Sequence, residues 1–237
     1  MTSTVLIAGS GFIGLALKER LQARGDVCVR MASRSSEDLK WDITDFDRAS
    51  AKSVYGLDGQ LEPASVEHIV VACGTSLFGP LEQFTPESWE ENVTGKLLSV
   101  SRLVLALVKE AKFLKDGGSI TITTGQASDF PSKAWPGLAV NNAGLNAFVK
   151  CAGLDLPRGL RLNAVSPCLV KETALKAGLP LAQTVTAADA ALVYEEVIFS
   201  AKTATVTLAG TQATIETKNK DGIAKTSQLG SLQEDGA

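Results

Sequence analysis

The chain has 237 residues, a net charge of −3 and a pI near 5.3, and 45% of its residues are hydrophobic. This composition can build a sizeable core and is not that of a disordered chain. The weak negative charge gives no long-range attraction to nucleic acid or to anionic lipid. No basic segment precedes the first apolar run, and no apolar run approaches the roughly 18 residues of a membrane span. We therefore expect a cytoplasmic protein with no nucleic-acid or membrane partner.

Short apolar runs alternate with helical patterns along the chain, which is typical of a parallel sheet covered by helices on both faces. The expected strands are residues 4–8, 27–32, 68–73, 119–124, 160–165 and 204–208. The expected helices are residues 12–21, 46–55, 88–114, 141–154 and 187–200. The sequence predicts one α/β domain, a doubly wound Rossmann-type sheet of about seven strands over residues 1–210.

Two segments depart from this alternation. Between Arg34 and Trp41 there are too few residues for the helical crossover that usually joins parallel strands, so we expect a helix to be missing there. Residues 211–237 are polar and poor in large apolar side chains, which predicts a flexible tail. The four cysteines are far apart and lack metal-type spacing, so we expect reduced thiols and no metal site.

The first motif with a chemical meaning is Gly9-Ser10-Gly11-Phe12-Ile13-Gly14, between an expected strand and an expected helix. In that setting the first glycine allows a tight turn, the second lets the backbone approach a pyrophosphate, and the third lets helix and strand pack closely. The free N–H groups of the helix N-terminus favour the anion. The motif predicts a dinucleotide site, and the alternative is a glycine-rich turn without a ligand.

The end of the second expected strand indicates which dinucleotide is preferred. An acidic residue there would bind the ribose hydroxyls of NAD, but the sequence has Ser33 followed by Arg34. Arg34 can bind a 2′-phosphate bidentately, which favours NADP(H) over NAD(H); the alternative is a solvated loop charge. Asp42, next to Ile43, can accept a hydrogen bond from the adenine amine or can cap the following helix.

The chain resembles the short-chain dehydrogenase/reductase family over nearly all of residues 4–210. The features that carry the resemblance are the glycine-rich turn, Asp42-Ile43-Thr44-Asp45, Ala72-Cys73-Gly74, Gly118-Ser119-Ile120, and Arg161-Leu162-Asn163-Ala164-Val165-Ser166-Pro167. The resemblance implies a cofactor site that also includes Ile43, Cys73, Gly74 and Pro167.

The family's catalytic groups are a Tyr acid/base, a Lys four residues later, a Ser that polarises the carbonyl, and an Asn on the preceding helix. The resemblance places Leu138 at the Tyr position and Asn142 at the Lys position, so both key groups are absent. Thr124 falls at the Ser position and keeps a hydroxyl. Lys96 falls at the Asn position, as if the family's Asn and Lys had exchanged places.

Lys96 is then the remaining proton donor, with a pKa lowered by burial and by a cationic nicotinamide. Two alternatives are open. Lys96 can be a solvated helix lysine or one paired with Glu90 or Glu91, and another register would make Asn92 the family's Asn.

Three functions are compatible with these residues. The family resemblance implies an NADP-dependent oxidoreductase acting on a small carbonyl or alcohol by a non-standard mechanism. The loss of the Tyr and Lys favours a non-catalytic NADP(H)-binding redox sensor or assembly subunit, and a lyase or isomerase is the third hypothesis. Apolar helices at 97–112 and 141–154 predict a homodimer or homotetramer.

Overall fold

The computed structural model describes residues 2–43, 57, 59–130, 133–179, 181 and 183–210. Its main sheet has seven strands in the order β3-β2-β1-β4-β5-β6-β9, and every neighbouring pair is parallel. The strands are β1 (Ser3–Ala8), β2 (Val27–Ser33), β3 (Leu39–Lys40), β4 (Val66–Val71), β5 (Leu114–Thr123), β6 (Arg161–Pro167) and β9 (Thr205–Ala209). This order confirms the predicted doubly wound, Rossmann-type sheet.

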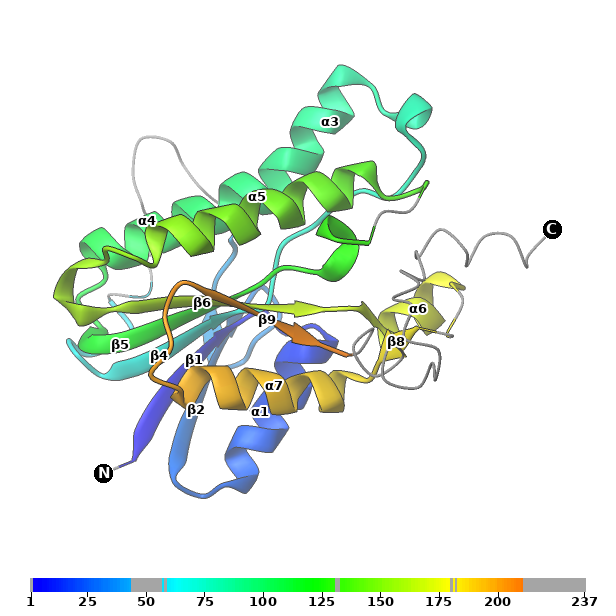
Figure 1. Cartoon of the computed structure of the whole chain (residues 1–237). Helices are drawn as coiled ribbons and strands as arrows, with labels where there is room; N and C mark the ends of the chain where they lie inside the picture. The colour runs from blue at the N-terminus through cyan, green and yellow to red at the C-terminus, as the bar shows by residue number, and fades with distance from the viewer. Residues whose placement is uncertain are drawn as a thin grey trace, which may run out of the picture.

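Helices cover both faces of the sheet (Figure 1). One face carries α1 (Phe12–Ala23) and α7 (Ala187–Phe199), and the other carries α3 (Pro86–Val93), α4 (Ser99–Glu110) and α5 (Pro136–Ala152). Each layer buries its own apolar cluster against the central strands. None of the helices in the described residues is long and apolar enough to cross a membrane.

The shorter elements lie mostly where strands meet helices. The short helix α6 (Lys171–Ala177) and a second, two-stranded sheet of β7 (Leu169–Val170) and β8 (Thr184–Val185) lie at the carboxyl ends of the main strands (Figure 1). Single helical turns are formed by Leu81–Gln83, Gln126–Ser128 and Pro157–Gly159, and a π-helical turn by Thr94–Leu98.

The helix predicted over 88–114 is wrong at its C-terminal end. Helical structure stops at Glu110, and Ala111 adopts an extended conformation (ψ 98°) that turns the chain into β5, which begins at Leu114. Phe113 and Leu114 are fully buried. A short apolar run fits a buried strand as well as a buried helix, so periodicity alone did not separate the two.

Other boundaries shift by a few residues. The strand predicted over 68–73 is β4, Val66–Val71, and the backbone leaves the sheet before Cys73. Helix α5 begins at Pro136, five residues before the predicted start, because proline fits the first turn of a helix. The predicted helix at 46–55, Thr44, Asp45 and the predicted tail at 211–237 lie outside the described residues.

The connection between β2 and β3 is as short as predicted and contains no helix. Residues 34–38 link two parallel strands, and local side chains replace the helix. Ser36 Oγ donates to the Met31 carbonyl at 2.7 Å, and Asp38 accepts from the Met31 N–H at 2.9 Å and from Arg30. These bonds hold the end of β2, which leads directly into the loop around Arg34.

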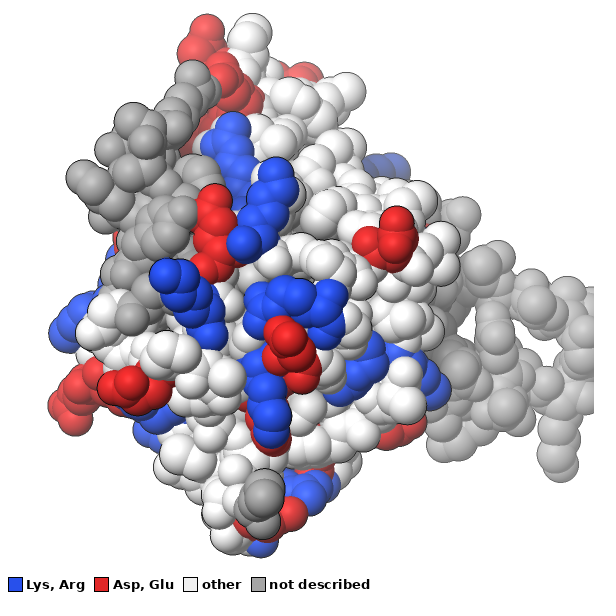
Figure 2. All heavy atoms as spheres, turned by 90° about the vertical axis from the view of Figure 1, so that its left-hand side faces the viewer, with Lys and Arg blue, Asp and Glu red and all other residues white. Residues whose placement is uncertain are grey.

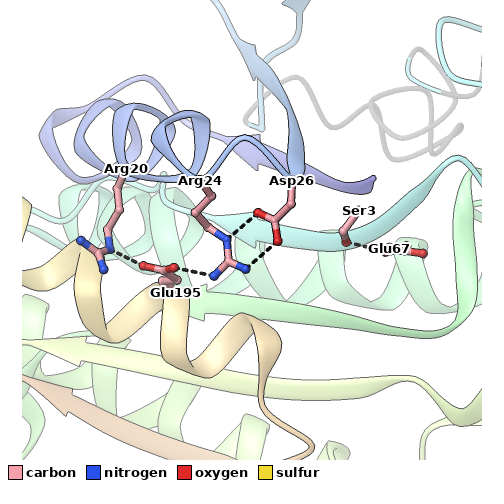
Figure 3. Close-up of polar contacts among 6 residues, drawn as sticks. All are labelled: Ser3, Arg20, Arg24, Asp26, Glu67 and Glu195. Atoms are coloured by element: carbon pink, nitrogen blue, oxygen red, sulfur yellow. Dashed lines mark hydrogen bonds and ion pairs between the residues drawn. The ribbon is translucent and has the colours of Figure 1, made fainter. Parts of the chain in front are cut away.

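The amino-terminal edge of the sheet carries many charged side chains, with acidic residues among the basic ones (Figure 2). Three ion pairs lie at this edge: Arg24–Asp26 at 2.9 Å within the loop before β2, Lys115–Glu67 at 2.7 Å between β5 and β4, and Arg158–Asp116 at 2.6 Å between the turn before β6 and β5. Glu195 of α7 accepts from Arg20 of α1 and from Arg24, which caps the C-terminus of α1, and so joins the two helices of one layer (Figure 3). This edge lies opposite to the carboxyl ends of the strands, where the predicted site residues gather.

Candidate functional site

The glycine-rich turn forms a cradle between β1 and α1. Gly9 has φ +125°, and a Cβ there would lie 2.5 Å from the Ala72 carbonyl oxygen; a Cβ on Gly14 would lie 2.0 Å from the Gly9 oxygen. A Cβ on Gly11 would meet nothing within 4 Å and would project into open space. Two glycines are therefore required by the packing of the protein itself, whereas Gly11 keeps a space clear at the N-terminus of α1.

A hollow extends from this cradle along the ends of β1, β2 and β4. The residues that line it include Ser10, Gly11, Ser33, Arg34, Asp42, Ile43, Cys73 and Gly74. The Arg34 side chain is 79% exposed, and its Nε lies 3.7 Å from an Asp42 oxygen. Ser10 and Ser35 hydroxyls meet at 3.0 Å across the hollow. An exposed guanidinium at the rim can turn toward an anion that enters there.

A second cavity, of about 260 Å³, adjoins the cradle at Gly74 and Ile13. It contains all four positions that the family resemblance marks as catalytic, namely Lys96, Thr124, Leu138 and Asn142, together with Pro167. The polar residues Ser76, Gln126 and Thr173 and the apolar residues Phe78, Trp135, Leu169 and Val170 complete much of its wall. We call it the inner cavity.

Lys96 reaches the inner cavity from the π-helical turn Thr94–Leu98, a rare element that often marks functional sites. The residue is only 8% exposed. Its Nζ donates to Asn142 Oδ1 at 2.8 Å and to the Thr124 carbonyl oxygen at 3.3 Å. Burial lowers the pKa of Lys96 to about 8. The alternative of a solvated lysine paired with Glu90 or Glu91 is therefore wrong.

The alternative register, with Asn92 at the family's Asn position, is not favoured by the geometry. Asn92 Oδ1 accepts from the Leu77 N–H at 2.8 Å and its Nδ2 donates to the Gly137 carbonyl at 3.2 Å. Both bonds hold neighbouring backbone together, and Asn92 does not line the inner cavity. Lys96 is the residue of this helix that reaches the predicted catalytic positions.

Thr124 lies at the end of β5 and is 3% exposed. Its backbone carbonyl accepts from Lys96, while its Oγ1 has no hydrogen-bond partner among the described residues. A buried hydroxyl without a partner is costly, and a ligand in the inner cavity that bonds this oxygen would remove that cost.

No described tyrosine replaces the missing acid. The hydroxyl of Tyr194 bonds Thr123 Oγ1 at 2.6 Å, and burial raises its pKa. Tyr194 belongs to the core beneath the sheet and not to the wall of the inner cavity. Leu138 stands in that wall and can neither donate nor accept a proton.

Two wall residues, Gln126 and Trp135, were not predicted from the sequence. Gln126 Nε2 donates to the Ser166 and Gly210 carbonyls at 3.1 and 2.9 Å, which ties the end of β5 to the ends of β6 and β9. Trp135 packs with Ala127 and with Leu138 in a small apolar cluster beside the cavity. The position of Gln126, two residues beyond Thr124, was the one available signal; nothing in the local pattern marked Trp135.

Comparison with known families is consistent with this geometry. The model of the family described as enoyl-(acyl carrier protein) reductase, a short-chain dehydrogenase type, matches residues 17–215. The chain belongs to the short-chain dehydrogenase/reductase family. No curated protein sequence matches it closely enough to count as a relative.

Solved structures share the fold, and some of them are described as short-chain dehydrogenases. The protein lin1944 from Listeria innocua is 33% identical, with 87% of this chain and 99% of that chain covered and a TM-score of 0.76. A small-chain dehydrogenase in complex with NADPH is 26% identical, with 89% and 97% covered and a TM-score of 0.71. A Pseudomonas aeruginosa short chain oxidoreductase, described as containing an atypical catalytic center, is 18% identical, with 88% and 95% covered and a TM-score of 0.70; at that identity the likeness shows the fold alone.

Proposed function

We propose that this short-chain dehydrogenase is an NADP(H)-dependent oxidoreductase of a small carbonyl or alcohol, in which Lys96 takes the part of the missing tyrosine. The observation that carries the proposal is the buried Lys96 ammonium, held against Asn142 and Thr124 in the inner cavity beside the glycine cradle. The predicted lyase or isomerase function has no observation of its own in its favour.

The residues of the cradle fit a nicotinamide dinucleotide. Open space above Gly11 and the start of α1 would accept the pyrophosphate, and the 26% identical neighbour was solved with NADPH. Ser33, Arg34, Asp42, Ile43, Cys73 and Gly74 would hold the adenosine half, with Arg34 on the 2′-phosphate. Pro167, in the wall of the inner cavity, is a further residue that would hold the cofactor, which when bound would supply a hydride to a carbonyl carbon.

Lys96 has the donor that the reaction requires. An ammonium carries three N–H groups, and the bonds to Asn142 and Thr124 use two of them. The third can donate to the substrate oxygen and transfer a proton as that oxygen gains negative charge. A pKa of about 8 keeps most of the group protonated at neutral pH and makes it a stronger acid than an ordinary lysine.

The other wall residues position and shield this proton transfer. Thr124 Oγ1, which has no partner among the described residues, can donate to the same substrate oxygen. Asn142 holds the Lys96 ammonium by accepting its hydrogen bond. Leu138 and Trp135 make one wall apolar, and an apolar wall strengthens the electrostatic contacts of the ammonium.

The test compares Lys96→Met with Lys109→Met, a matched change at an exposed lysine of α4. We expect Lys96→Met to lower kcat/KM for NADPH-dependent carbonyl reduction by about 100- to 10,000-fold and Lys109→Met to leave it unchanged. Wild-type kcat/KM should fall as the pH rises through about 8. Turnover that survives Lys96→Met would remove Lys96 from the mechanism. Tight NADPH binding without turnover of any aldehyde or ketone would instead favour the redox sensor.

We also propose that the chain forms a homodimer or homotetramer through α4 and α5. These helices present an apolar surface, formed by Leu105, Val140, Ala143, Ala147 and Cys151 and continued by Leu154 just beyond α5, all of them exposed. A charge at its centre, Ala147→Glu, should shift the protein to a smaller species in analytical ultracentrifugation. An unchanged sedimentation coefficient would show that this surface is not the interface.

A further inference from the structure

Lys96 is the one charged side chain among the described residues that line the inner cavity. Its two described partners, the Asn142 amide and the Thr124 carbonyl, are neutral oxygens. A buried ammonium that lacks an anionic partner costs free energy, and its neutral partners offset only part of that cost. The protein therefore keeps an uncompensated positive charge at the inner end of this cavity.

The other titratable groups near Lys96 do not supply the missing charge. The thiol of Cys73 lies at the end of β4 on the Gly74 side, and that of Cys168 lies beyond β6 in the cavity wall. Burial raises the pKa of Cys73 to about 12 and that of Cys168 to about 11, so both thiols are neutral below pH 10. The polar side chains from the α5 and β5 sides, which are those of Thr123, Thr124, Gln126 and Asn142, do not titrate.

The rest of the wall is suited to an apolar ligand body. Phe78 and Trp135 offer aromatic surface, and Leu138, Leu169 and Val170 offer aliphatic surface. Cavities of this kind bind ligands whose apolar part fills the space and whose one polar end is fixed by a few placed groups. Here the placed groups are hydrogen-bond donors, namely the third N–H of Lys96 and the Oγ1 of Thr124.

We propose that the substrate of this site is a small apolar α-oxo carboxylic acid, bound with its carboxylate against Lys96. This rests on the proposed function in so far as the ligand is called a substrate. The carboxylate supplies the missing counter-charge. Its neighbouring ketone oxygen lies on the next carbon, so the third N–H of Lys96 can be shared between a carboxylate oxygen and the ketone oxygen, and the Thr124 hydroxyl can donate to the ketone oxygen as well. A neutral ketone would leave the charge uncompensated, and a cationic one would be repelled.

Benzoylformate and its methyl ester make a matched pair of probes, because they share the phenyl ring and the ketone and differ in the charge. Binding to the NADPH-loaded protein is measured by calorimetry, and turnover is measured separately by NADPH oxidation. At pH 7 we expect benzoylformate to bind at least about tenfold more tightly than the ester. Lys96→Met should remove this difference, and Lys109→Met should keep it.

The pH dependence gives a second measurement that needs no variant. Benzoylformate stays ionised above pH 5, so its affinity should follow the charge of Lys96 and fall toward that of the ester as the pH rises well above 8. The affinity of the ester should change little over the same range.

The outcomes separate this inference from the proposed function. Equal binding of acid and ester, or reduction of the ester alone, would overturn the oxo acid and leave the oxidoreductase standing. Selective, Lys96-dependent binding of benzoylformate without NADPH oxidation would support the anion site but overturn the oxo acid as a substrate. The oxidoreductase itself would be overturned only if no aldehyde or ketone were turned over either. Selective binding with turnover would support both.

Discussion

Lys96 and Asn142 meet directly, with the ammonium donating to the amide oxygen at 2.8 Å across the gap between the π-helical turn and α5. In the family pattern an amide comes from the first of these helices and an ammonium from the second. By the match that the family resemblance gives, the two groups stand on exchanged helices, and in this chain they are in direct contact. The ammonium lies in the inner cavity, whose wall has Leu138 at the position matched to the family's tyrosine.

Asn142→Asp tests this contact. A carboxylate 2.8 Å from the ammonium would favour its charged form, so the pKa of Lys96 should rise above its present value of about 8. We expect the alkaline limit of kcat/KM to move upward by about one pH unit or more, and selective binding of benzoylformate to weaken because the counter-charge is now internal. Asn146→Asp, one turn further along α5 and outside the cavity lining, is the control. An unchanged pH profile in Asn142→Asp would show that Lys96 is not the titrating group.

Two glycines of the cradle have different roles: Gly14 is required for packing, and Gly11 is proposed to leave space for the cofactor. Gly14→Ala should lower the free energy of unfolding by at least about 2 kcal/mol, because its Cβ would overlap the Gly9 carbonyl. Gly11→Ala should leave stability nearly unchanged, because its Cβ meets nothing, yet weaken NADPH binding at least about tenfold by filling the phosphate space. Chemical denaturation and calorimetric titration measure the two effects. A destabilised Gly11→Ala with normal affinity would contradict the assignment of the cradle.

The proposed preference for NADP(H) over NAD(H) depends on Arg34. Its side chain is exposed and its Asp42 contact is long, at 3.7 Å, so an incoming 2′-phosphate can compete for the guanidinium. Arg34→Ala should lower the ratio of NADPH to NADH affinity by about ten- to a hundredfold and leave NADH affinity nearly unchanged. Lys40→Ala, an exposed cation on the neighbouring strand β3, controls for a general loss of positive charge. An unchanged ratio in Arg34→Ala would remove the preference for NADP(H).

The sequence predicted the fold well because the central strands are short apolar runs bounded by glycine and polar residues, as Thr4 to Ala8 before Gly9 illustrates. The resemblance placed Lys96 and Asn142 at two of the family's catalytic positions, but their direct contact depends on a π-helical turn that no local pattern encodes. Trp135 and Gln126 reach the cavity through loop geometry, which depends on tertiary packing. The absence of a crossover helix between β2 and β3 was predictable, because it follows from the number of residues between Arg34 and Trp41 alone.

The contact between α1 and α7 at the amino-terminal edge gives a matched pair of stability variants. Glu195 is 14% exposed at its side chain; burial alone would raise its pKa, but hydrogen bonds from Arg24 and Arg20 outweigh burial and lower it. Glu195→Gln should cost about 0.5–1 kcal/mol of unfolding free energy. The adjacent Glu196 is 70% exposed and lies 3.9 Å from Lys202, so Glu196→Gln should cost almost nothing. Equal losses in the two variants would show that the double arginine contact contributes nothing measurable.

His68, the single histidine of the chain, makes stability depend on pH. Its Nδ1 bonds Ser119 Oγ at 2.8 Å and its ring meets Phe199 edge-on. Burial, and then the nearby Arg161 charge, lower its pKa to about 4. The unfolded chain takes up this proton near pH 6.5 and the folded chain does not, so unfolding is increasingly favoured as the pH falls from about 6.5 to 4.

Between pH 6.5 and 4, the loss of unfolding free energy that is caused by His68 should be of the order of 2 kcal/mol. His68→Asn removes the titrating ring and keeps a polar atom near Ser119. At each pH, the urea-unfolding free energies of the wild type and of His68→Asn are measured and subtracted. The contribution of the carboxylates, which both proteins protonate, cancels in this difference. That difference should shift in favour of the variant below pH 6. A constant difference from pH 7 to 4 would mean that His68 is protonated equally easily in the folded and unfolded chains.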